Sequence, residues 1–363
     1  MNISTESKVK AAYLLLEDGT VFEGYSMGKQ GTAIGEVIFN TNMTTYQDLC
    51  KDPTYCGQIV AQTYPLIGNR GVDPDAASKL QANGYIVREW CVEPTDADEF
   101  VTLDVYLKQA SIVGLCGIDT RSLTRHIRKN GVMNGAITDN LDNKESLLKD
   151  IKDYRVPPSI GRVTTSKPYS IKSEKGLYKI AVPDYGFNTE FLKFLTDKGC
   201  DVMVYPAYAS AKEILSSNPD GIMLSDGPGD PWDNPEIIEI IKELISTKKP
   251  VLGLGLGHQL LGVANGFEII KLAVGHRGSN QPVKDINTGK IMTTSQNHGY
   301  AVDINSVDEN IAEVNLININ DKTCEGLLYK NFPGITVQFE PTDGLGWQDT
   351  AWVFESYINM LKK

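Results

Sequence analysis

The sequence predicts an α/β protein of two domains: a strand-rich N-terminal domain, followed by a doubly wound domain with a mostly parallel sheet. The chain has 363 residues, which is enough for two domains that each bury a core. Its first half begins with short apolar runs between turn residues, whereas its second half alternates apolar runs with helical patterns. Residues 156–178 are rich in Pro, Ser and Thr and are the predicted linker between domains at 1–155 and 179–363.

Charge and composition exclude several classes of protein. The formal net charge of -11 and the sequence pI of about 5.0 argue against a nucleic-acid partner or an anionic membrane partner. No apolar run reaches transmembrane length, and residues 1–10 are too polar for a secretion signal. The six cysteines lack metal-ligand spacing and are expected to be free thiols. We therefore expect a cytoplasmic protein without a nucleic-acid or membrane partner.

The first domain begins with a predicted β-hairpin, in which residues 13–16 and 21–22 flank a turn at 17–20. Further strands are predicted at residues 36–40, 59–61 and 84–87. Residues 119–129 are predicted to form a helix, because Asp119 is a good N-cap and basic residues lie near the C-terminal end.

The second domain alternates predicted strands and helices. The strands are expected at residues 179–182, 202–205, 221–224 and 251–254, and the helices at 191–197, 211–216 and 235–246. This alternation is typical of parallel strands with helices on both faces. In such sheets the ligand site lies beyond the carboxyl ends of the strands.

Residues 251–261 form the most informative stretch. The apolar run at 251–254 meets glycines at alternate positions, and a helical pattern follows at 259–264. This order predicts a strand, a sharp turn and a helix, the geometry that lifts one side chain above a sheet beside a helix N-terminus. The middle residue of such a turn carries the nucleophile, but here it is Gly255.

This stretch resembles the G-x-C-x-G-x-Q signature of class I glutamine amidotransferases, and more narrowly the small subunit of carbamoyl phosphate synthetases. Gly253, Gly257, His258 and Gln259 lie in register with the signature, and Gly255 takes the place of its cysteine. The framing residue His258, like His298 in a second motif, is expected to be structural rather than a relocated base.

Other segments support the resemblance. Residues 224–231 are similar to the family's glycine loop and residues 295–300 to its glutamine-binding strand. Residues 35–47, 63–69 and 117–121 are similar to the N-terminal domain of the same small subunits. The resemblance therefore covers nearly the whole chain and implies an amidotransferase-like second domain.

The catalytic residues that the resemblance requires are all substituted. In the family's late motif Q-x-H-P-E, the histidine position is Glu340 here and the carboxylate position is Thr342. Loss of a triad nucleophile alone costs on the order of a million-fold in turnover, or roughly 8 kcal/mol. We therefore expect no intact catalytic residue and effectively no glutaminase activity. A relocated nucleophile at Cys56 is one alternative, and an ordinary small buried residue is the other.

The resemblance also implies a set of binding residues. The backbone N–H of Leu256, with that of Gly227 or Gly229, would form the oxyanion hole. The residues implied to line a pocket for the amino-acid end of glutamine are Thr54, Leu256, Gln259, Asn297, Gly299 and Tyr300. These residues either bind glutamine or a related small molecule without hydrolysis, or persist because they hold the loops together. Glu340 favours the second interpretation, because it adds an anionic group to a site built around a neutral amide.

Glycine at position 255 has a physical advantage of its own. A nucleophile elbow holds a non-glycine residue in a strained conformation, at a cost of about 1–3 kcal/mol. Glycine removes that strain, so the change should stabilise the fold while it abolishes the chemistry.

Three functions are compatible with these features. The first is a degenerate small subunit, without a cofactor of its own, bound to a large subunit that carries ATP and Mg²⁺ and uses free ammonia. The second is a stand-alone protein that binds glutamine or a similar small molecule, without a synthetase partner. The third is an enzyme with new chemistry based on Glu340, which is disfavoured because no second activated group accompanies it.

Overall fold

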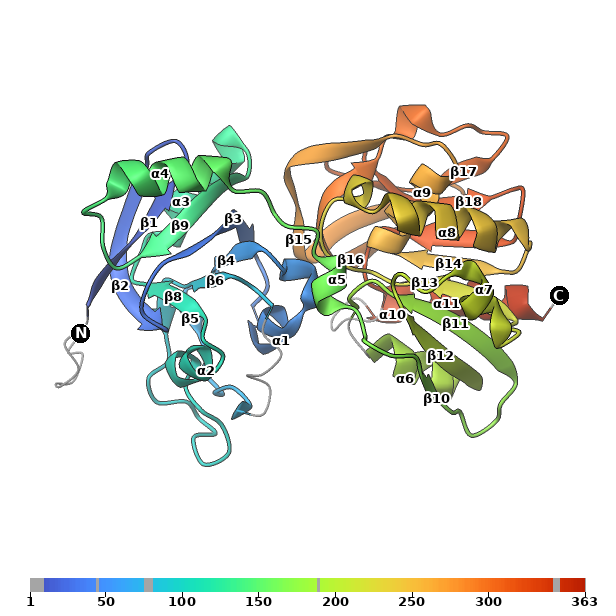
Figure 1. The fold of residues 1–363 in the computed structure, drawn as a ribbon, viewed down its shortest axis with the longest axis horizontal. Helices are drawn as coiled ribbons and strands as arrows, with labels where there is room; N and C mark the ends of the chain where they lie inside the picture. Colours follow the sequence, from blue (N-terminus) through green and yellow to red (C-terminus); the bar gives the residue numbers. More distant parts are fainter. Residues whose placement is uncertain (1–9, 44–45, 75–80, 188–189, 342–346, 363) are drawn as a thin grey trace. The chain divides into compact units, whose positions relative to one another are not determined.

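The computed structural model describes residues 10–43, 46–74, 81–187, 190–341 and 347–362 (Figure 1). The chain divides into two compact units, Met1–Pro157 and Pro158–Lys363, and each is described by itself. Within the described residues, no helix is both long and apolar enough to span a membrane.

The first unit is a closed barrel with the strand order β1-β2-β8-β6-β4-β3-β9. Its strands are β1 (Ala11–Leu16), β2 (Val21–Gly28), β3 (Ala33–Asn40), β4 (Gln58–Gln62), β6 (Gly84–Ile86), β8 (Val113–Cys116) and β9 (Met133–Thr138). The predicted hairpin is confirmed, because β1 and β2 pair antiparallel, with Ala11 opposite Tyr25 and Leu15 opposite Val21. Three neighbouring pairs, β3–β4, β4–β6 and β6–β8, are parallel.

Helices cover the barrel from outside. Helix α2 (Leu103–Gln109) packs its buried residues on one face of β3, β4 and β6, and helix α4 (Lys144–Asp153) places Ile151 against Leu15 and Ala136. The remaining elements of the unit are α1 (Tyr46–Lys51), η1 (Pro53–Tyr55), β5 (Leu66–Ile67), β7 (Glu89–Trp90) and α3 (Thr120–Asn130). Burial of alternate strand residues under the helices stabilises the barrel through the hydrophobic effect.

The second unit is built on one sheet of ten strands, in the order β10-β12-β11-β13-β14-β19-β18-β17-β15-β16. The strands are β10 (Tyr169–Ile171), β11 (Tyr178–Asp184), β12 (Cys200–Pro206), β13 (Gly221–Leu224), β14 (Val251–Leu254), β15 (Ile269–Asp285), β16 (Ile291–Val302), β17 (Ala312–Asn318), β18 (Cys324–Tyr329) and β19 (Gly334–Val337). Strands β12, β11, β13, β14 and β19 pair parallel, and all other neighbours in the sheet pair antiparallel.

The sheet is therefore mixed, and the expectation of a mostly parallel sheet is wrong. That expectation came from the strand–helix alternation up to residue 254. Beyond helix α9 (Leu256–Ala264), strands β15 to β19 follow one another with no α-helix between them in the described chain. Short connections join antiparallel neighbours, whereas a parallel pair needs a long crossover.

The doubly wound arrangement is confirmed for the parallel part of the sheet. Helices α7 (Ala211–Ser216), α8 (Pro235–Ser246) and α9 share one apolar cluster, and α6 (Glu190–Asp197) and α11 (Trp352–Leu361) share another (Figure 1). The buried strands alternate between the clusters: Val251 belongs to the first and Leu252 to the second. The last helices of the chain are α10 (Trp347–Thr350) and α11.

The segment at 156–178, expected as a linker, belongs mostly to the second unit. The division falls between Pro157 and Pro158. Beyond it, the segment forms helix α5 (Ile160–Val163) and strand β10, which pairs antiparallel with β12. An edge strand pairs through its backbone, so it does not require the apolar pattern that was missing from the sequence.

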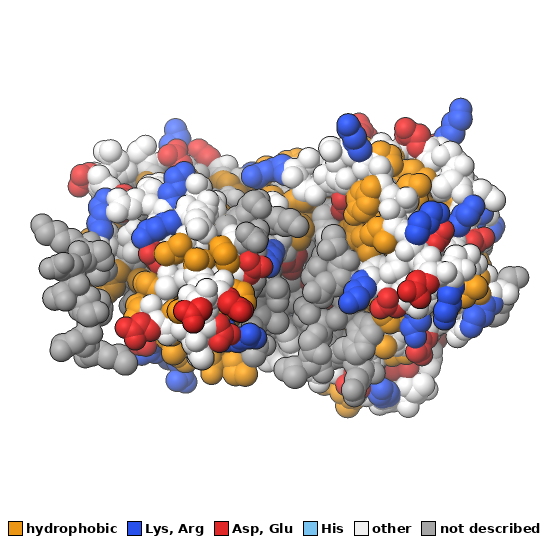
Figure 2. Space-filling model, turned by 90° about the horizontal axis from the view of Figure 1, so that it is seen from below, with side chains coloured by type: hydrophobic (Ala, Val, Ile, Leu, Met, Phe, Trp, Pro, Cys, Tyr) orange, Lys and Arg blue, Asp and Glu red, His pale blue; other side chains and the backbone are white. Residues whose placement is uncertain are grey.

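On the face drawn in Figure 2, basic and acidic side chains are not separated into large patches of one charge. Basic and acidic side chains lie interspersed on each unit, with apolar side chains between them. The net charge of -11 is therefore not gathered into one acidic patch on this face.

The cap of helix α3 is confirmed and provides a first testable prediction. Asp119 accepts a hydrogen bond from the N–H of Ser122 at 2.9 Å, and Gly131, with φ of 88°, ends the helix. Asp119→Ala should lower the free energy of unfolding of the first unit by about 1 kcal/mol, because the cap acceptor is lost. Urea unfolding of the full chain measures this. Asp119→Asn keeps an acceptor and should retain most of the stability; equal losses in both variants would contradict the role of the cap.

Candidate functional site

The centre of the candidate site is the turn between β14 and α9. Gly255 connects them with φ of 49° and ψ of -110°, a conformation that L-residues rarely adopt. The N–H of Gly257 donates to the carbonyl of Ser225 at 3.0 Å, so the first turn of α9 lies directly on the end of β13. A Cβ on Gly257 would lie 2.4 Å from the carbonyl oxygen of Leu224, and this close approach requires glycine. The predicted strand, turn and helix are confirmed.

Two backbone N–H groups converge at this turn. The N–H of Leu256 and the N–H of Gly227 both donate to one carboxylate oxygen, Oδ1 of Asp226, at 2.8 and 2.7 Å. They are the pair expected from the resemblance, with Gly227 rather than Gly229 as the second donor. Gly229 lies further along the same loop with φ of 97°, and a Cβ built there would meet no heavy atom within 4 Å. A pair of N–H groups on one oxygen has the arrangement of an oxyanion hole.

Gln259 lies inside the structure rather than in an open pocket. Its side chain is buried, and its Nε2 donates to the carbonyl of Tyr300 at 2.8 Å and to Oε1 of Gln338 at 2.9 Å. These bonds join helix α9 to strand β16 and to the segment after β19. The amide of Gln259 therefore ties three elements together.

Two of the predicted residues on strand β16, Asn297 and Gly299, occupy alternate positions. Asn297 and Gly299 are partly exposed, and the intervening His298 and preceding Gln296 are buried. Tyr300 is also partly exposed, and the Nζ of Lys271 lies 5.7 Å from its ring centroid. Asn297 and Gly299 thus share one side of the strand, opposite the buried polar residues.

The segment that carries Glu340, at the histidine position of the family, follows a strand that is bonded to the elbow. The N–H of Gly255 donates to the carbonyl of Val337 at 3.0 Å, and the N–H of Glu340 donates to the carbonyl of Ser295 at 2.9 Å. Glu340 is partly exposed. Thr342 lies outside the described residues. Thr54 belongs to the first unit, where it is buried in η1.

The histidines of the second unit are not available as bases at the elbow. The Nδ1 of His258 lies 2.8 Å from Oγ1 of Thr336, and burial lowers the pKa of His258 to about 3. Burial, together with the neighbouring His276, holds the pKa of His298 well below its usual value. His258 and His298 are therefore hydrogen-bonded structural residues, as the sequence indicated.

Two buried thiols of the second unit, Cys200 and Cys324, are unsuited to nucleophilic attack. Burial raises the pKa of both Cys200 and Cys324 to about 12, so neither is a thiolate at neutral pH. Cys56 is buried in the first unit, where its backbone bridges to Ala82. All five cysteines whose side chains are described are free.

Comparison with known proteins decides the family. The family model described as carbamoyl-phosphate synthase small chain, CPSase domain, matches residues 14–137, and the glutamine amidotransferase class-I model matches residues 181–360. A carbamoyl phosphate synthase small chain of Bacillus thuringiensis is 44% identical over 351 residues, which is 96% of this chain and 95% of that relative. The chain belongs to the carbamoyl phosphate synthase small-chain family.

Relatives from other bacteria agree. A small chain of Fusobacterium nucleatum is 43% identical over 347 residues, covering 95% of this chain and 96% of the relative. One of Staphylococcus epidermidis is 42% identical over 353 residues, covering 96% of each. The resemblance drawn from the motifs is therefore confirmed, and the elbow lies inside the amidotransferase domain of this small-chain family member.

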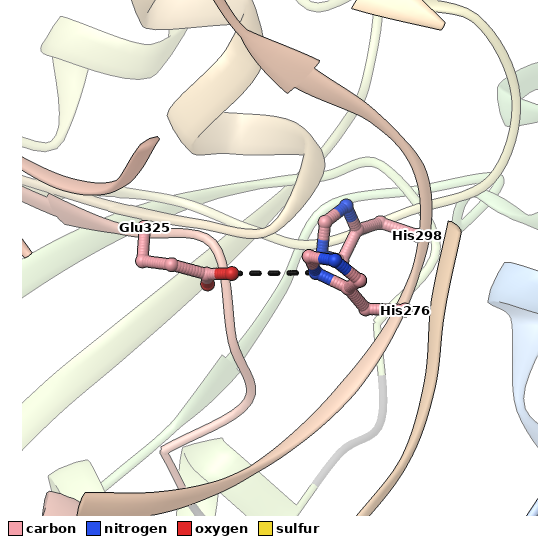
Figure 3. A group of neighbouring side chains, drawn as sticks. All are labelled: His276, His298 and Glu325. Carbon is pink, nitrogen blue, oxygen red and sulfur yellow. Dashed lines mark ion pairs between the residues drawn. The ribbon is translucent and has the colours of Figure 1, made fainter. Parts of the chain in front are cut away.

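A buried polar network beside the candidate site was not predicted. His276 on β15, His298 on β16 and Glu325 on β18 lie together (Figure 3), with ligand-type atoms within 4.8 Å of one another. The Nδ1 of His276 lies 3.3 Å from Oε1 of Glu325, and its Nε2 lies 2.8 Å from Oδ2 of Asp321. The three side chains come from three different strands, so no local spacing could have indicated the group.

Hydrogen bonds already occupy the polar atoms of this network. Gln296 donates from Nε2 to Oε2 of Glu325 at 2.8 Å, and its Oε1 lies 2.9 Å from Nδ1 of His276 and 3.0 Å from Nε2 of His298. Burial by itself would lower the pKa of His276, but hydrogen bonds and charge from Asp321 and Glu325 raise it to about 9. The charge of protonated His276 is paired with the carboxylates of Asp321 and Glu325, and removing one partner would leave a buried charge uncompensated. A metal ion would first have to displace the proton of His276.

The network predicts a pH-dependent stability. The pKa of His276 rises from 6.5 to about 9 on folding, so its contribution is fully present below pH 6.5 and is lost as the pH rises through 9. The contribution should be about 3 kcal/mol at most, at 1.36 kcal/mol per pKa unit. Urea unfolding between pH 6 and 9.5 measures it.

His276→Gln is the matched control, because glutamine does not titrate in this range. The stability difference between the wild type and this variant should be largest below pH 6.5 and should shrink toward pH 9. A difference that stays constant over that range would show that His276 is not charged in the folded protein.

Proposed function

We propose that this chain is the small subunit of a carbamoyl phosphate synthase with an inactive glutaminase, and that it serves a large subunit that uses free ammonia. Its role in the complex would be structural or regulatory. This proposal adopts the partner implied by the words "small chain" in the names of its relatives.

The observation that carries the proposal is the turn itself. The elbow and its two N–H donors have the geometry of an acyl-transfer site, yet Gly255 has no side chain to attack a carbonyl. A million-fold loss of turnover is typical when a triad nucleophile is removed, because an oxyanion hole alone supplies only about a thousand-fold over water. Such a residual rate is far too low to provide ammonia for a synthetase.

Three described groups of the second unit do not compensate for the missing nucleophile. The thiols of Cys200 and Cys324 are protonated at neutral pH, and His258 is a buried neutral imidazole bonded to Thr336. The substitution of glutamate at position 340 removes the general base of the family as well. The losses are mutually consistent, since a base has no use where there is no nucleophile.

The framing residues support a scaffold rather than a catalyst. Gln259 and His258 form hydrogen bonds within the domain, so their retention is explained by stability alone. In this proposal the chain binds no cofactor, and ATP and Mg²⁺ bind to the large subunit. Glutamine binding by the residues that the resemblance implies, among them Asn297, Gly299 and Tyr300, is not required.

The proposal predicts a specific choice of nitrogen source. Purified chain, alone and mixed with a candidate large subunit, should release no ammonia from glutamine above the blank. The mixture should form a stable complex by size-exclusion chromatography and should make carbamoyl phosphate from ammonium, ATP and bicarbonate. Replacing ammonium by glutamine should abolish the product, because no thiolate is available to cleave the amide.

The matched variant is Cys56→Ser. Glutamine turnover at a rate near that of ammonia use would sink the proposal, and loss of that turnover in Cys56→Ser would identify a relocated nucleophile. Failure of any large subunit to bind, with no ammonia release, would instead favour a stand-alone protein that binds a glutamine-like small molecule.

A further inference from the structure

The carboxylate of Asp226 lies where a substrate oxygen would lie. Its Oδ1 accepts both N–H groups of the candidate oxyanion hole, from Leu256 at 2.8 Å and from Gly227 at 2.7 Å. The Asp226 side chain is buried, with only 6% of its surface exposed. The hole is therefore filled from within by an oxygen of the chain itself.

Asp226 also occupies the space of the missing nucleophile. A Cβ built on Gly255 would lie 2.1 Å from both Cγ and Oδ1 of Asp226, and 2.4 Å from Oδ2. Real Cβ atoms do not approach other atoms this closely, so the two side chains exclude each other. The absence of a side chain at position 255 is thus a condition for the observed position of Asp226.

The backbone around Asp226 is held firmly. Ser225 donates from Oγ to the carbonyl of Asp226 at 2.9 Å and accepts the N–H of Tyr185 at 2.8 Å. The carbonyl of Ser225 accepts the N–H of Gly257 at 3.0 Å, which fixes the loop to the first turn of α9. The carboxylate also faces the positive end of the dipole of α9, a helix of nine residues.

We propose that Asp226 is an internal ligand of the oxyanion hole, which closes it to a substrate oxygen, and that Gly255 and Asp226 act as a pair. A neutral carbonyl is a weaker acceptor than a carboxylate, so the oxygen of a glutamine amide does not displace Asp226. This inference deepens the proposed function and rests on it in one respect: both take the amidotransferase site to be without glutaminase activity. It adds that restoring a side chain at position 255 would not reopen the site while Asp226 remains.

Formate is a direct probe of the hole. Asp226→Ala should lower the melting temperature of the protein by roughly 5–10 °C, the shift expected for the loss of two charge-assisted hydrogen bonds in a domain of this size. Sodium formate should then raise the melting temperature of Asp226→Ala in a saturable manner, because its carboxylate can occupy the vacated position. Sodium chloride at the same ionic strength is the salt control.

Asp226→Asn is the matched variant, because its amide oxygen can still accept both N–H groups and its size still fills the hole. Formate should leave both the wild type and Asp226→Asn unchanged relative to chloride. Equal formate effects in all three proteins, or an Asp226→Ala variant as stable as the wild type, would overturn the proposal.

A double-mutant cycle tests the pairing with Gly255. Gly255→Ala introduces both a clash with Asp226 and a strained φ, whereas in the Asp226→Ala background only the strain remains. The drop in melting temperature caused by Gly255→Ala should therefore be smaller in that background. Additive effects would show that the two residues do not share the space, and the formate experiment still decides the proposal if Gly255→Ala fails to fold.

Neither readout depends on ammonia release. Glutaminase activity from a relocated nucleophile would overturn the proposed function but would leave the formate rescue and the coupling intact. Failure of both, in a protein without glutaminase activity, would overturn the internal ligand alone.

Discussion

The arrangement of the candidate site depends on the turn at Gly255, which must pass from β14 to α9 within one residue. The turn requires a positive φ at Gly255 and a close approach of Gly257 to the end of β13. Once these conditions are met, the first N–H of α9 points at the loop that follows β13, where Gly227 supplies a second donor. The oxyanion hole is thus a consequence of how the strand meets the helix, and it persists without the nucleophile. Buried N–H groups of this kind need an acceptor, and here Asp226 provides it.

The other polar residues that frame the site also have hydrogen-bond partners within the domain. His258, Gln259 and His298 all lie in motifs associated with glutamine hydrolysis, yet each one is bonded to other parts of the domain. A buried polar side chain that loses its partner costs about 1–3 kcal/mol, so stability alone is a sufficient reason for these residues to be retained. A residue in a motif of an enzyme family can therefore be retained for its role in folding as well as for its role in catalysis. The chemistry is indicated by the residues at the family's catalytic positions, which are Gly255 and Glu340 here.

The residue at position 255 bears on both the chemistry and the stability of this site. A residue with a side chain at position 255 would be strained and would compete with Asp226 for space. Glycine removes both costs, and the carboxylate gains two charge-assisted hydrogen bonds. The network around His276 adds a second group of paired charges in the same domain, where protonated His276 contacts both Asp321 and Glu325 and hydrogen bonds join three strands. In both places charged side chains are bonded to other groups of the same domain, Asp226 to two backbone N–H groups and His276 to two carboxylates.

The sequence by itself determined the elements whose signals are local. The hairpin of β1 and β2, the cap at Asp119, the strands up to residue 254 and the turn at Gly255 all follow from patterns of a few neighbouring residues. The family and the absence of its cysteine were equally readable, because motifs are contiguous. Tertiary structure alone decided the barrel closure, the antiparallel half of the sheet and the incorporation of β10, because strand pairing depends on backbone contacts between distant segments. It also decided that Asp226 fills the oxyanion hole and that Glu325 meets His276, since the sequence does not encode the distance between side chains on separate strands and loops.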